Sequence, residues 1–191
     1  MYGSSAAGLA ANLGLTKEEA ERLIELYFST FPGIKDYVEL THRMAIENHY
    51  VFSPFYQRKM TYGAKPAFKG TAVYNGALRL GQNVRVQNAS SSFGLHNFGL
   101  LNDAIKPLGG KGLCNVYDSF EMEALLETAA EVIELTYFHL EENPVNIFDW
   151  LDLPVTIDVE IGYNWGKTRH VKRGTSQEQV LQILKELRTS S

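Results

Sequence analysis

The sequence predicts an α+β fold in which helices come first and short antiparallel strands follow. A hydroxyl three residues before a glutamate, Thr16 to Glu19, is a capping box and precedes an apolar repeat at helical spacing. Strand-like alternation appears later, in Leu113–Glu123 and Pro154–Gly162. With 191 residues and 45% hydrophobic content, the chain can bury one good core or two small lobes.

Three helices are expected at the N-terminal end. Ser4–Leu13 reads as a short helix, and Gly14 supplies a stop after it. The capping box then starts a second helix, which runs to about Thr30 before Phe31-Pro32-Gly33 breaks it. Ile34–Asn48 is the third. Together they predict an all-helical lobe.

The expected secondary structure changes twice in the middle of the chain. His49–Gly63 is rich in aromatic and β-favouring residues and contains the basic pair Arg58-Lys59, so a small hairpin or an extended crossing is expected. Ala67 to about Lys106 supports either one long helix or two abutting helices. Pro107 and the glycines after it end this helical stretch.

Four elements are expected in the C-terminal half. Leu113–Glu123 reads as strand, tight turn and strand, with Asp118 in the turn. Ala124–Leu140 is an amphipathic helix that Asn143-Pro144 ends, and Pro154–Gly162 is a half-buried strand.

The tail after Thr168 ends in one more predicted helix. Thr175 and Glu178 have capping-box spacing and precede an apolar stripe, which needs a surface to cover. We expect this helix to dock on the rest of the protein or on a partner, with the basic run from His170 to Arg173 near a DNA backbone.

Composition restricts the class of protein. A single cysteine, Cys114, excludes an internal disulfide framework, suits a reducing cytoplasm and is expected to be a small buried residue. No run of about 18 apolar residues predicts a membrane span. The net charge of −4 gives no global signature of a nucleic-acid-binding protein, so any DNA contact is expected to be local.

One polar stripe on the long helix has a spacing that suits DNA. Arg79, Asn83 and Gln87 are four residues apart and therefore lie on one helical face over about 12 Å. Donors in such a stripe can reach the acceptors that every base pair presents in the minor groove. The alternative is an ordinary solvated polar face.

Six segments, in order, resemble the C-terminal part of family A DNA polymerases, over Met1 to Thr168. They are Tyr2-Gly3 with the Ser5–Ala10 segment after it, Leu26–Gly33, Arg58-Lys59, the Arg79-x-x-x-Asn83-x-x-x-Gln87 helix, Val116-Tyr117-Asp118-Ser119, and Val159–Trp165. Three positions depart from the family pattern: Gln57 replaces a glycine, Tyr117 a histidine and Ser119 a glutamate.

The resemblance implies a role for each of these residues. Asp118 matches the second of two aspartates that hold two Mg²⁺ ions, and Tyr117 stands near the primer terminus and joins it as a catalytic residue. Arg79, Asn83 and Gln87 match residues that contact the minor groove of primer–template DNA. The remaining DNA-binding positions implied by the resemblance are Arg58, Lys59 and Tyr2.

The resemblance also implies an incomplete polymerase. Residues 1–73 correspond to a helical fingers remnant, residues 74–168 to the C-terminal half of an antiparallel-sheet palm, and residues 169–191 to a C-terminal extension. The first aspartate and the dNTP triphosphate clamp are expected on an N-terminal polymerase polypeptide, as in a phage-type split polymerase of an infected bacterial cell. The chain is then inactive alone. The alternative is an inactive duplex-binding or structural remnant.

Overall fold

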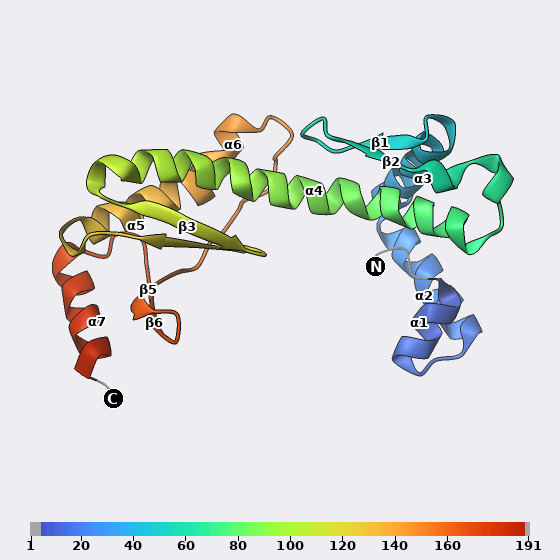
Figure 1. Ribbon diagram of the computed structural model, residues 1–191. Coiled ribbons are helices and arrows are strands. Elements are labelled where there is room, and N and C mark those ends of the chain that lie inside the picture. Colours follow the sequence, from blue (N-terminus) through green and yellow to red (C-terminus); the bar gives the residue numbers. More distant parts are fainter. Residues whose placement is uncertain (1–4, 190–191) are drawn as a thin grey trace. The chain divides into compact units, whose positions relative to one another are not determined.

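The computed structural model describes residues 5–189. The chain forms two compact units, Met1–Ser90 and Ser91–Ser191. One long helix, α4 (Ala72–Ile105), contributes residues to both units (Figure 1). Of the two alternatives that the sequence left open for this stretch, the single helix is therefore the one observed.

The first three helices form as their local signals predict. Helix α1 (Ala6–Leu13) ends at Gly14, whose φ of 68° is the left-handed conformation that glycine adopts without strain. Helix α2 (Lys17–Thr30) begins with both hydrogen bonds of the predicted capping box. Helix α3 (Pro32–Glu47) begins at the proline itself, because proline is favoured in the first helical turn.

A short hairpin and two 3-10 turns complete the first unit. Strands β1 (Tyr50–Phe52) and β2 (Arg58–Met60) pair antiparallel, which confirms the hairpin over the extended crossing. Turns at Tyr62–Ala64 and Pro66–Phe68 lead into α4. The buried core of this unit consists of small residues: Ala45, Val51, Ala64 and Ala77.

The second unit begins with the C-terminal part of α4 and a second hairpin. After a 3-10 turn at Lys106–Leu108, strands β3 (Lys111–Val116) and β4 (Ser119–Glu123) pair antiparallel. The register shifts between Gly112 and Cys114, as at a β-bulge. Cys114 is exposed, so the prediction that it is buried is wrong.

The helix after β4 starts later than predicted and continues further. Residues 124–125 precede a 3-10 turn at Leu126–Thr128, and α5 spans Ala129–Tyr137. The Thr128 hydroxyl donates to the Leu108 carbonyl oxygen (2.9 Å), a distant contact that competes with an earlier helix start. A π-helical turn, Phe138–Glu142, then leads into α6 (Pro144–Ile147), so the proline opens a short helix.

The last elements are a hairpin and a helix. Strand β5 spans Val159–Asn164 and pairs with β6 (Lys167–Val171), which the sequence pattern did not predict. Helix α7 spans Gln177–Thr189. Its capping box uses Ser176 and Gln179, which exchange two hydrogen bonds, one residue beyond the predicted pair.

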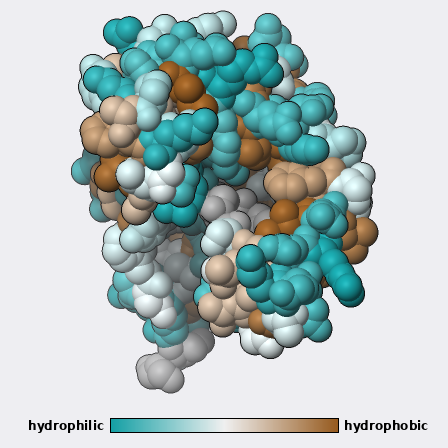
Figure 2. Space-filling model, turned by 90° about the vertical axis from the view of Figure 1, so that its right-hand side faces the viewer, coloured by the Kyte–Doolittle hydropathy of each residue, from teal (hydrophilic) through white to brown (hydrophobic). Residues whose placement is uncertain are grey.

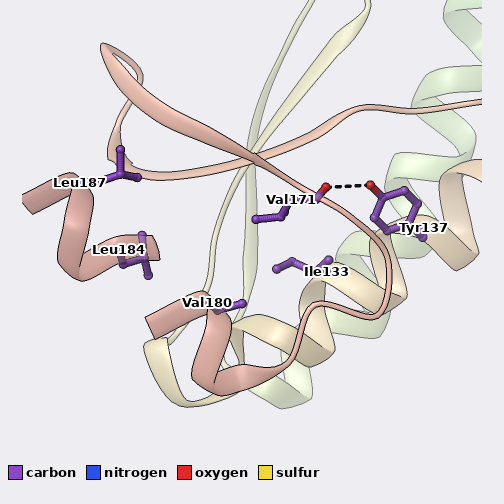
Figure 3. Packing of buried hydrophobic residues seen from close by; sticks show 6 residues of the cluster. All are labelled: Ile133, Tyr137, Val171, Val180, Leu184 and Leu187. Atoms are coloured by element: carbon purple, nitrogen blue, oxygen red, sulfur yellow. Dashed lines mark hydrogen bonds between the residues drawn. The ribbon is translucent and has the colours of Figure 1, made fainter. Parts of the chain in front are cut away.

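Helix α7 docks on its own unit. Its apolar stripe packs against α5 and β6 in a buried cluster made of Ile133, Tyr137, Val171, Val180, Leu184 and Leu187 (Figure 3). The Tyr137 hydroxyl donates to the Val171 carbonyl oxygen (3.0 Å), so the one polar atom of this ring is satisfied within the cluster. The tail is thus part of a folded core.

Candidate active-site hairpin and DNA-binding helix

The turn between β3 and β4 holds the predicted catalytic residues. Val116 pairs with Ser119, which leaves Tyr117 and Asp118 as a two-residue loop. Tyr117 has a φ of 57° and a side chain that is 96% exposed. A positive φ at the first loop position is typical of a type II′ turn, where glycine is the usual residue, so this tyrosine is held in a strained conformation.

Side chains beside the loop hold it in place. The Asn115 amide nitrogen donates to the carbonyl oxygens of Tyr117 (3.1 Å) and Ser119 (3.0 Å). The Ser119 hydroxyl donates to the Val116 carbonyl oxygen (3.0 Å). The backbone that carries Asp118 is therefore fixed by bonds across the loop.

The carboxylate of Asp118 is available for a ligand. Asp118 is exposed, and within residues 5–189 its carboxylate takes no hydrogen bond and no ion pair. Oxygen ligands are the ones that Mg²⁺ prefers, and a protein often supplies only one or two carboxylates to it. Within the part of the chain that the structure describes, no three or more His, Cys, Asp or Glu side chains gather as a metal site. Asp118 thus fits as one ligand among several.

Helix α4 supports this hairpin from its C-terminal part. The rings of Phe98 and Phe120 stack with their centroids 4.6 Å apart. A side chain at Gly94 would press on the Phe120 ring, so the glycine permits this close approach. The Gly112 amide donates to the Asn102 side-chain oxygen (2.9 Å). Stacking and hydrogen bonding together dock both strands on the helix.

Trp165, which the sequence placed in a family motif without a structural role, also supports the hairpin. The Trp165 indole nitrogen donates to a Glu121 carboxylate oxygen at 2.7 Å, which joins the β5–β6 turn to β4. Glu121 lies three residues after Asp118. An indole N–H needs an acceptor, but only the fold shows which carboxylate, 44 residues away, supplies it.

The predicted polar stripe lies on the solvent side of α4. Arg79 and Gln87 are exposed and Asn83 is half-buried. Ala77 and Gly81, two residues before Arg79 and Asn83, are buried and face the first unit's core. Two residues correspond to about 200° around a helix, so the stripe and the packed face are opposed.

The packed side of α4 carries its own polar anchors, which the sequence reasoning missed. The Arg85 guanidinium donates to the Phe52 carbonyl oxygen and to the Thr41 hydroxyl, each at 2.9 Å. The Asn88 amide donates to the Gln57 side-chain oxygen at 2.6 Å. These bonds hold the β1–β2 hairpin along the helix.

The basic pair on β2 does not act as one patch. Successive residues of a strand point to opposite faces, so Arg58 and Lys59 project from different sides of the hairpin. The Arg58 guanidinium lies 5.2 Å from the centre of the Tyr50 ring. Tyr2, the remaining predicted DNA-binding residue, lies outside the described residues.

Positive charge is concentrated around this helix and hairpin. Residues 48–102 contain six Lys and Arg residues and no Asp or Glu, although the whole chain has a net charge of −4. All six lie at or before Arg85, in the first unit. A basic segment of this kind suits the local DNA contact that was expected, which stays a prediction, and counting charges along the chain could have found the segment.

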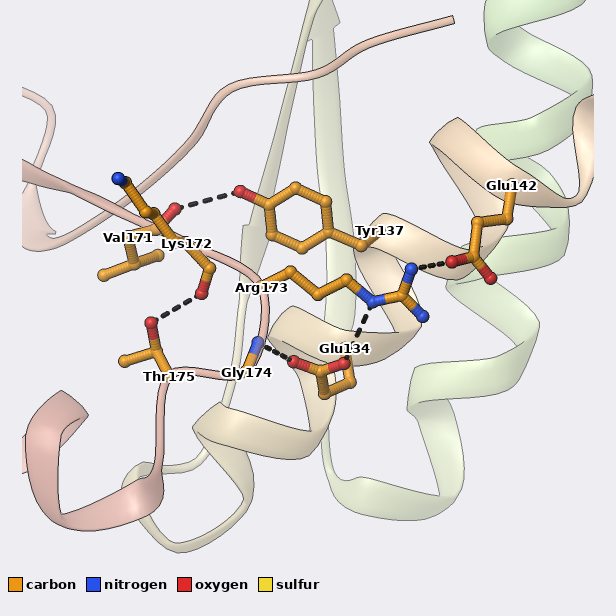
Figure 4. Close-up of polar contacts among 8 residues, drawn as sticks. All are labelled: Glu134, Tyr137, Glu142, Val171, Lys172, Arg173, Gly174 and Thr175. Carbon is orange, nitrogen blue, oxygen red and sulfur yellow. Dashed lines mark hydrogen bonds and ion pairs between the residues drawn. The ribbon is translucent and has the colours of Figure 1, made fainter. Parts of the chain in front are cut away.

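Two members of the basic run in the tail, in contrast, lie beside carboxylates. Arg173 forms ion pairs with Glu134 and Glu142, and the backbone N–H of Gly174 donates to Glu134 (Figure 4). The His170 imidazole lies 3.9 Å from an Asp158 oxygen. The contact between the tail and a DNA backbone stays a prediction.

Of the helices in residues 5–189, none is both long and apolar enough to cross a membrane. The face shown in Figure 2 is mostly hydrophilic, with apolar patches between the polar regions. Exposed large apolar side chains in the first unit include Leu13, Leu26 and Phe31.

The fold matches that of a solved polymerase domain. The polymerase domain of Pol1 from M. smegmatis, solved in complex with DNA primer-template and dNTP, superimposes with a TM-score of 0.71 at 26% identity. The match covers 81% of this chain and 26% of that one. Residues 1–167 match the model of DNA polymerase family A. The chain therefore belongs to DNA polymerase family A.

Curated relatives agree with this assignment. The thermostable DNA polymerase I of Thermus filiformis is 30% identical over 165 residues, which cover 86% of this chain and 19% of the relative. DNA polymerase I of Deinococcus radiodurans is 29% identical over 169 residues, covering 88% of this chain and 17% of the relative. The chain thus spans about a fifth of the length of these relatives.

Proposed function

We propose that this chain is the C-terminal part of a template-directed DNA polymerase. The observation that carries the proposal is Asp118, an exposed carboxylate without an internal partner, at the tip of a docked hairpin in a family A chain. A polymerase needs oxygen ligands at such a position, and a turn that is fixed on both sides can present one in a constant orientation.

In this proposal Asp118 holds Mg²⁺ together with a second aspartate on N-terminal polymerase segments. The metal, when bound, stabilises negative charge on the attacking and leaving oxygens of phosphoryl transfer. Tyr117 presents a phenol that can donate one hydrogen bond near the primer terminus. Asn115 and the Trp165–Glu121 bond keep the hairpin in place while substrate binds.

The DNA contacts of the proposal lie on α4. Arg79, Asn83 and Gln87 face solvent along one side of the helix, in the segment where positive charge gathers. Their donors suit acceptors that the minor groove presents in every base pair, which permits binding without sequence preference. Arg58 and Lys59 add sequence-independent attraction for phosphates.

We further propose that activity requires the N-terminal polymerase segments, whether on the same polypeptide or on a separate one as in a split polymerase, so that residues 1–191 are inactive alone. The finding that motivates this step is that the relatives are about five times longer than the matched region. dNTP binding then depends on groups that these N-terminal segments supply.

Primer extension tests the proposal. Purified chain and N-terminal polypeptide are assayed alone and mixed, with Mg²⁺, dNTP and primer–template DNA. Extension is expected only from the mixture. Asp118→Asn, which keeps the shape of the side chain, should reduce it by at least about a thousandfold. Asp149→Asn, at another exposed aspartate, is the matched control and should leave the rate unchanged.

The opposite result would identify a non-enzymatic protein. If the two polypeptides assemble, as shown by size-exclusion chromatography, yet extend no primer, the catalytic proposal is wrong. Tyr117 and Ser119 would then mark a site that has lost its chemistry, and duplex binding by the α4 stripe would be the remaining function.

A further inference from the structure

The tip of the β1–β2 hairpin carries a tyrosine in a backbone conformation that large residues rarely adopt. The loop Pro54-Phe55-Tyr56 connects Ser53 to Gln57, and the Tyr56 amide donates to the Ser53 carbonyl oxygen at 2.9 Å. Tyr56 follows this turn with a φ of 57°. In three-residue hairpin loops this left-handed position is normally occupied by glycine. A tyrosine here is strained.

The side chain at this strained backbone position is also almost fully exposed. Tyr56 is 88% accessible, and its ring packs on no other ring or cation among the described residues. Strain is not compensated by burial here, because the ring gains no core contact. A large aromatic residue held outward in this way indicates a contact with another molecule.

The position of the tip relative to the polar stripe is fixed by hydrogen bonds. Gln57, the residue after Tyr56, accepts a 2.6 Å hydrogen bond from Asn88, the residue after Gln87. The Phe52 carbonyl oxygen is held by Arg85, one turn earlier on α4. The hairpin therefore runs along the helix and ends at the Gln87 end of the stripe.

Along the sequence, the segment that holds Tyr56 is cationic and aromatic. Residues 48–69 contain no carboxylate and four cations: Arg58, Lys59, Lys65 and Lys69. Exposed aromatic rings are interleaved with them, at Phe52, Tyr56, Tyr62 and Phe68. Phe52, Arg58 and Lys59 lie on the hairpin itself with Tyr56, and the other residues lie in the turns between the hairpin and α4. Cations that follow a phosphate backbone, combined with rings on which bases stack, are the means by which proteins bind single-stranded DNA without sequence preference.

We propose that Tyr56 is a stacking platform for an unpaired DNA base at the Gln87 end of the α4 stripe. The substrate class is a duplex with a single-stranded overhang: the duplex lies along the stripe, and the first unpaired bases reach the hairpin tip. The proposal rests on the proposed function, because it takes the ligand to be primer–template DNA.

Binding of labelled DNA to the full chain tests this inference without any polymerase activity. The probes are a fluorescein-labelled duplex with an oligo-dA 5′ overhang and the same duplex with blunt ends, each followed by fluorescence anisotropy. Tyr56→Gly should weaken binding of the overhang probe about tenfold, because one stacked base is lost. Binding of the blunt probe should stay unchanged.

Two variants make the result specific. Tyr56→Gly suits the left-handed φ, so its thermal midpoint should equal or exceed that of the wild-type chain, and lost binding is then not a loss of fold. Tyr56→Phe keeps the ring and should bind the overhang probe like the wild-type chain.

Three outcomes would overturn the stacking platform. One is unchanged overhang binding by Tyr56→Gly, and another is an equal loss on both probes. The third is overhang binding that Tyr56→Gly weakens only when the N-terminal polypeptide is bound to the chain. That result would make Tyr56 a protein-binding residue. In each case blunt-duplex binding and Asp118-dependent extension still decide the proposed function separately.

Discussion

Trp165 and Glu121 are joined by a 2.7 Å hydrogen bond between the indole nitrogen and a carboxylate oxygen. The bond connects two hairpins of the second unit that share no strand pairing. It also lies within three residues of Asp118, so the position of the proposed metal ligand depends on a contact made from the far end of the chain.

We expect Glu121→Ala to lower the free energy of unfolding by about 0.5–1.5 kcal/mol, because a hydrogen bond to a charged but partly solvated acceptor is lost. Glu121→Gln retains an acceptor and should lose less. Urea unfolding followed by tryptophan fluorescence measures both. An equal loss in the two variants would show that the charge, and not the hydrogen bond, stabilises the hairpin.

The α4 stripe yields a prediction about duplex DNA. Asn83→Ala and Gln87→Ala should each weaken binding of a blunt duplex about three- to tenfold, since each removes a hydrogen-bond donor. Arg79→Ala should also reduce the salt dependence of binding by about one unit of slope. Leu95→Ala, at an exposed position of the same helix that lies at least about 80° around the axis from each stripe residue, is the control. Equal losses in all four variants would contradict a specific role for the stripe.

Two leucines of α7 provide a matched pair for testing the tail. Leu184 is 6% exposed within the core, whereas Leu181 is 45% exposed on the same helix. Leu184→Ala should lower the free energy of unfolding by about 2–4 kcal/mol, and Leu181→Ala by less than about 1 kcal/mol. Chemical denaturation of the full chain measures the difference. Similar values for both would mean that α7 does not pack as observed.

Half-buried histidines should make stability depend on pH, and His139 is one of the two whose pKa burial lowers. Burial lowers the pKa of His139, and its Nδ1 atom is buried without a hydrogen-bond partner among the described residues. The unfolded chain therefore binds a proton at a higher pH than the folded chain does. Stability is at its maximum above the unfolded pKa of about 6.5 and falls as the pH drops through it.

His139→Gln should flatten this dependence between about pH 7 and pH 5, because it removes the titrating ring. The comparison is the denaturation midpoint at several pH values in both proteins. His96→Gln, at an exposed histidine without an ion pair among the described residues, controls for the loss of an imidazole as such. A dependence that stays equally steep in His139→Gln would assign the effect to other groups.

Local signals predicted much of the fold. The capping box at Thr16 and the glycine at position 14 set helix ends through bonds within a few residues, and the structure has both as predicted. Strand β6 was missed because its polar residues show no alternation, and only pairing with β5 and packing on α7 make it a strand. Helix α5 starts later than predicted, after Thr128, whose hydroxyl bonds to Leu108, 20 residues away, and no local pattern indicates that contact.

The candidate site, like the fold, has features that local patterns predict and contacts that only the folded chain shows. Asp118 in a turn and the shared face of Arg79 and Gln87 follow from spacing alone, so both could be placed from the sequence. The contacts that hold these elements in place could not be predicted from spacing. Arg85 reaches Thr41 and Phe52, which are 44 and 33 residues distant, and those contacts exist only once α3, β1 and α4 have packed together.

The acid-free stretch from residue 48 to 102 has a consequence for how this acidic chain meets DNA. The remaining residues carry all 22 carboxylates and only 12 of the 18 Lys and Arg side chains. The acid-free stretch therefore attracts a polyanion, whereas the remaining residues, with ten more carboxylates than Lys and Arg side chains, repel it. We infer that the association rate with DNA falls steeply as salt is added, although the pI of the chain is 5.7.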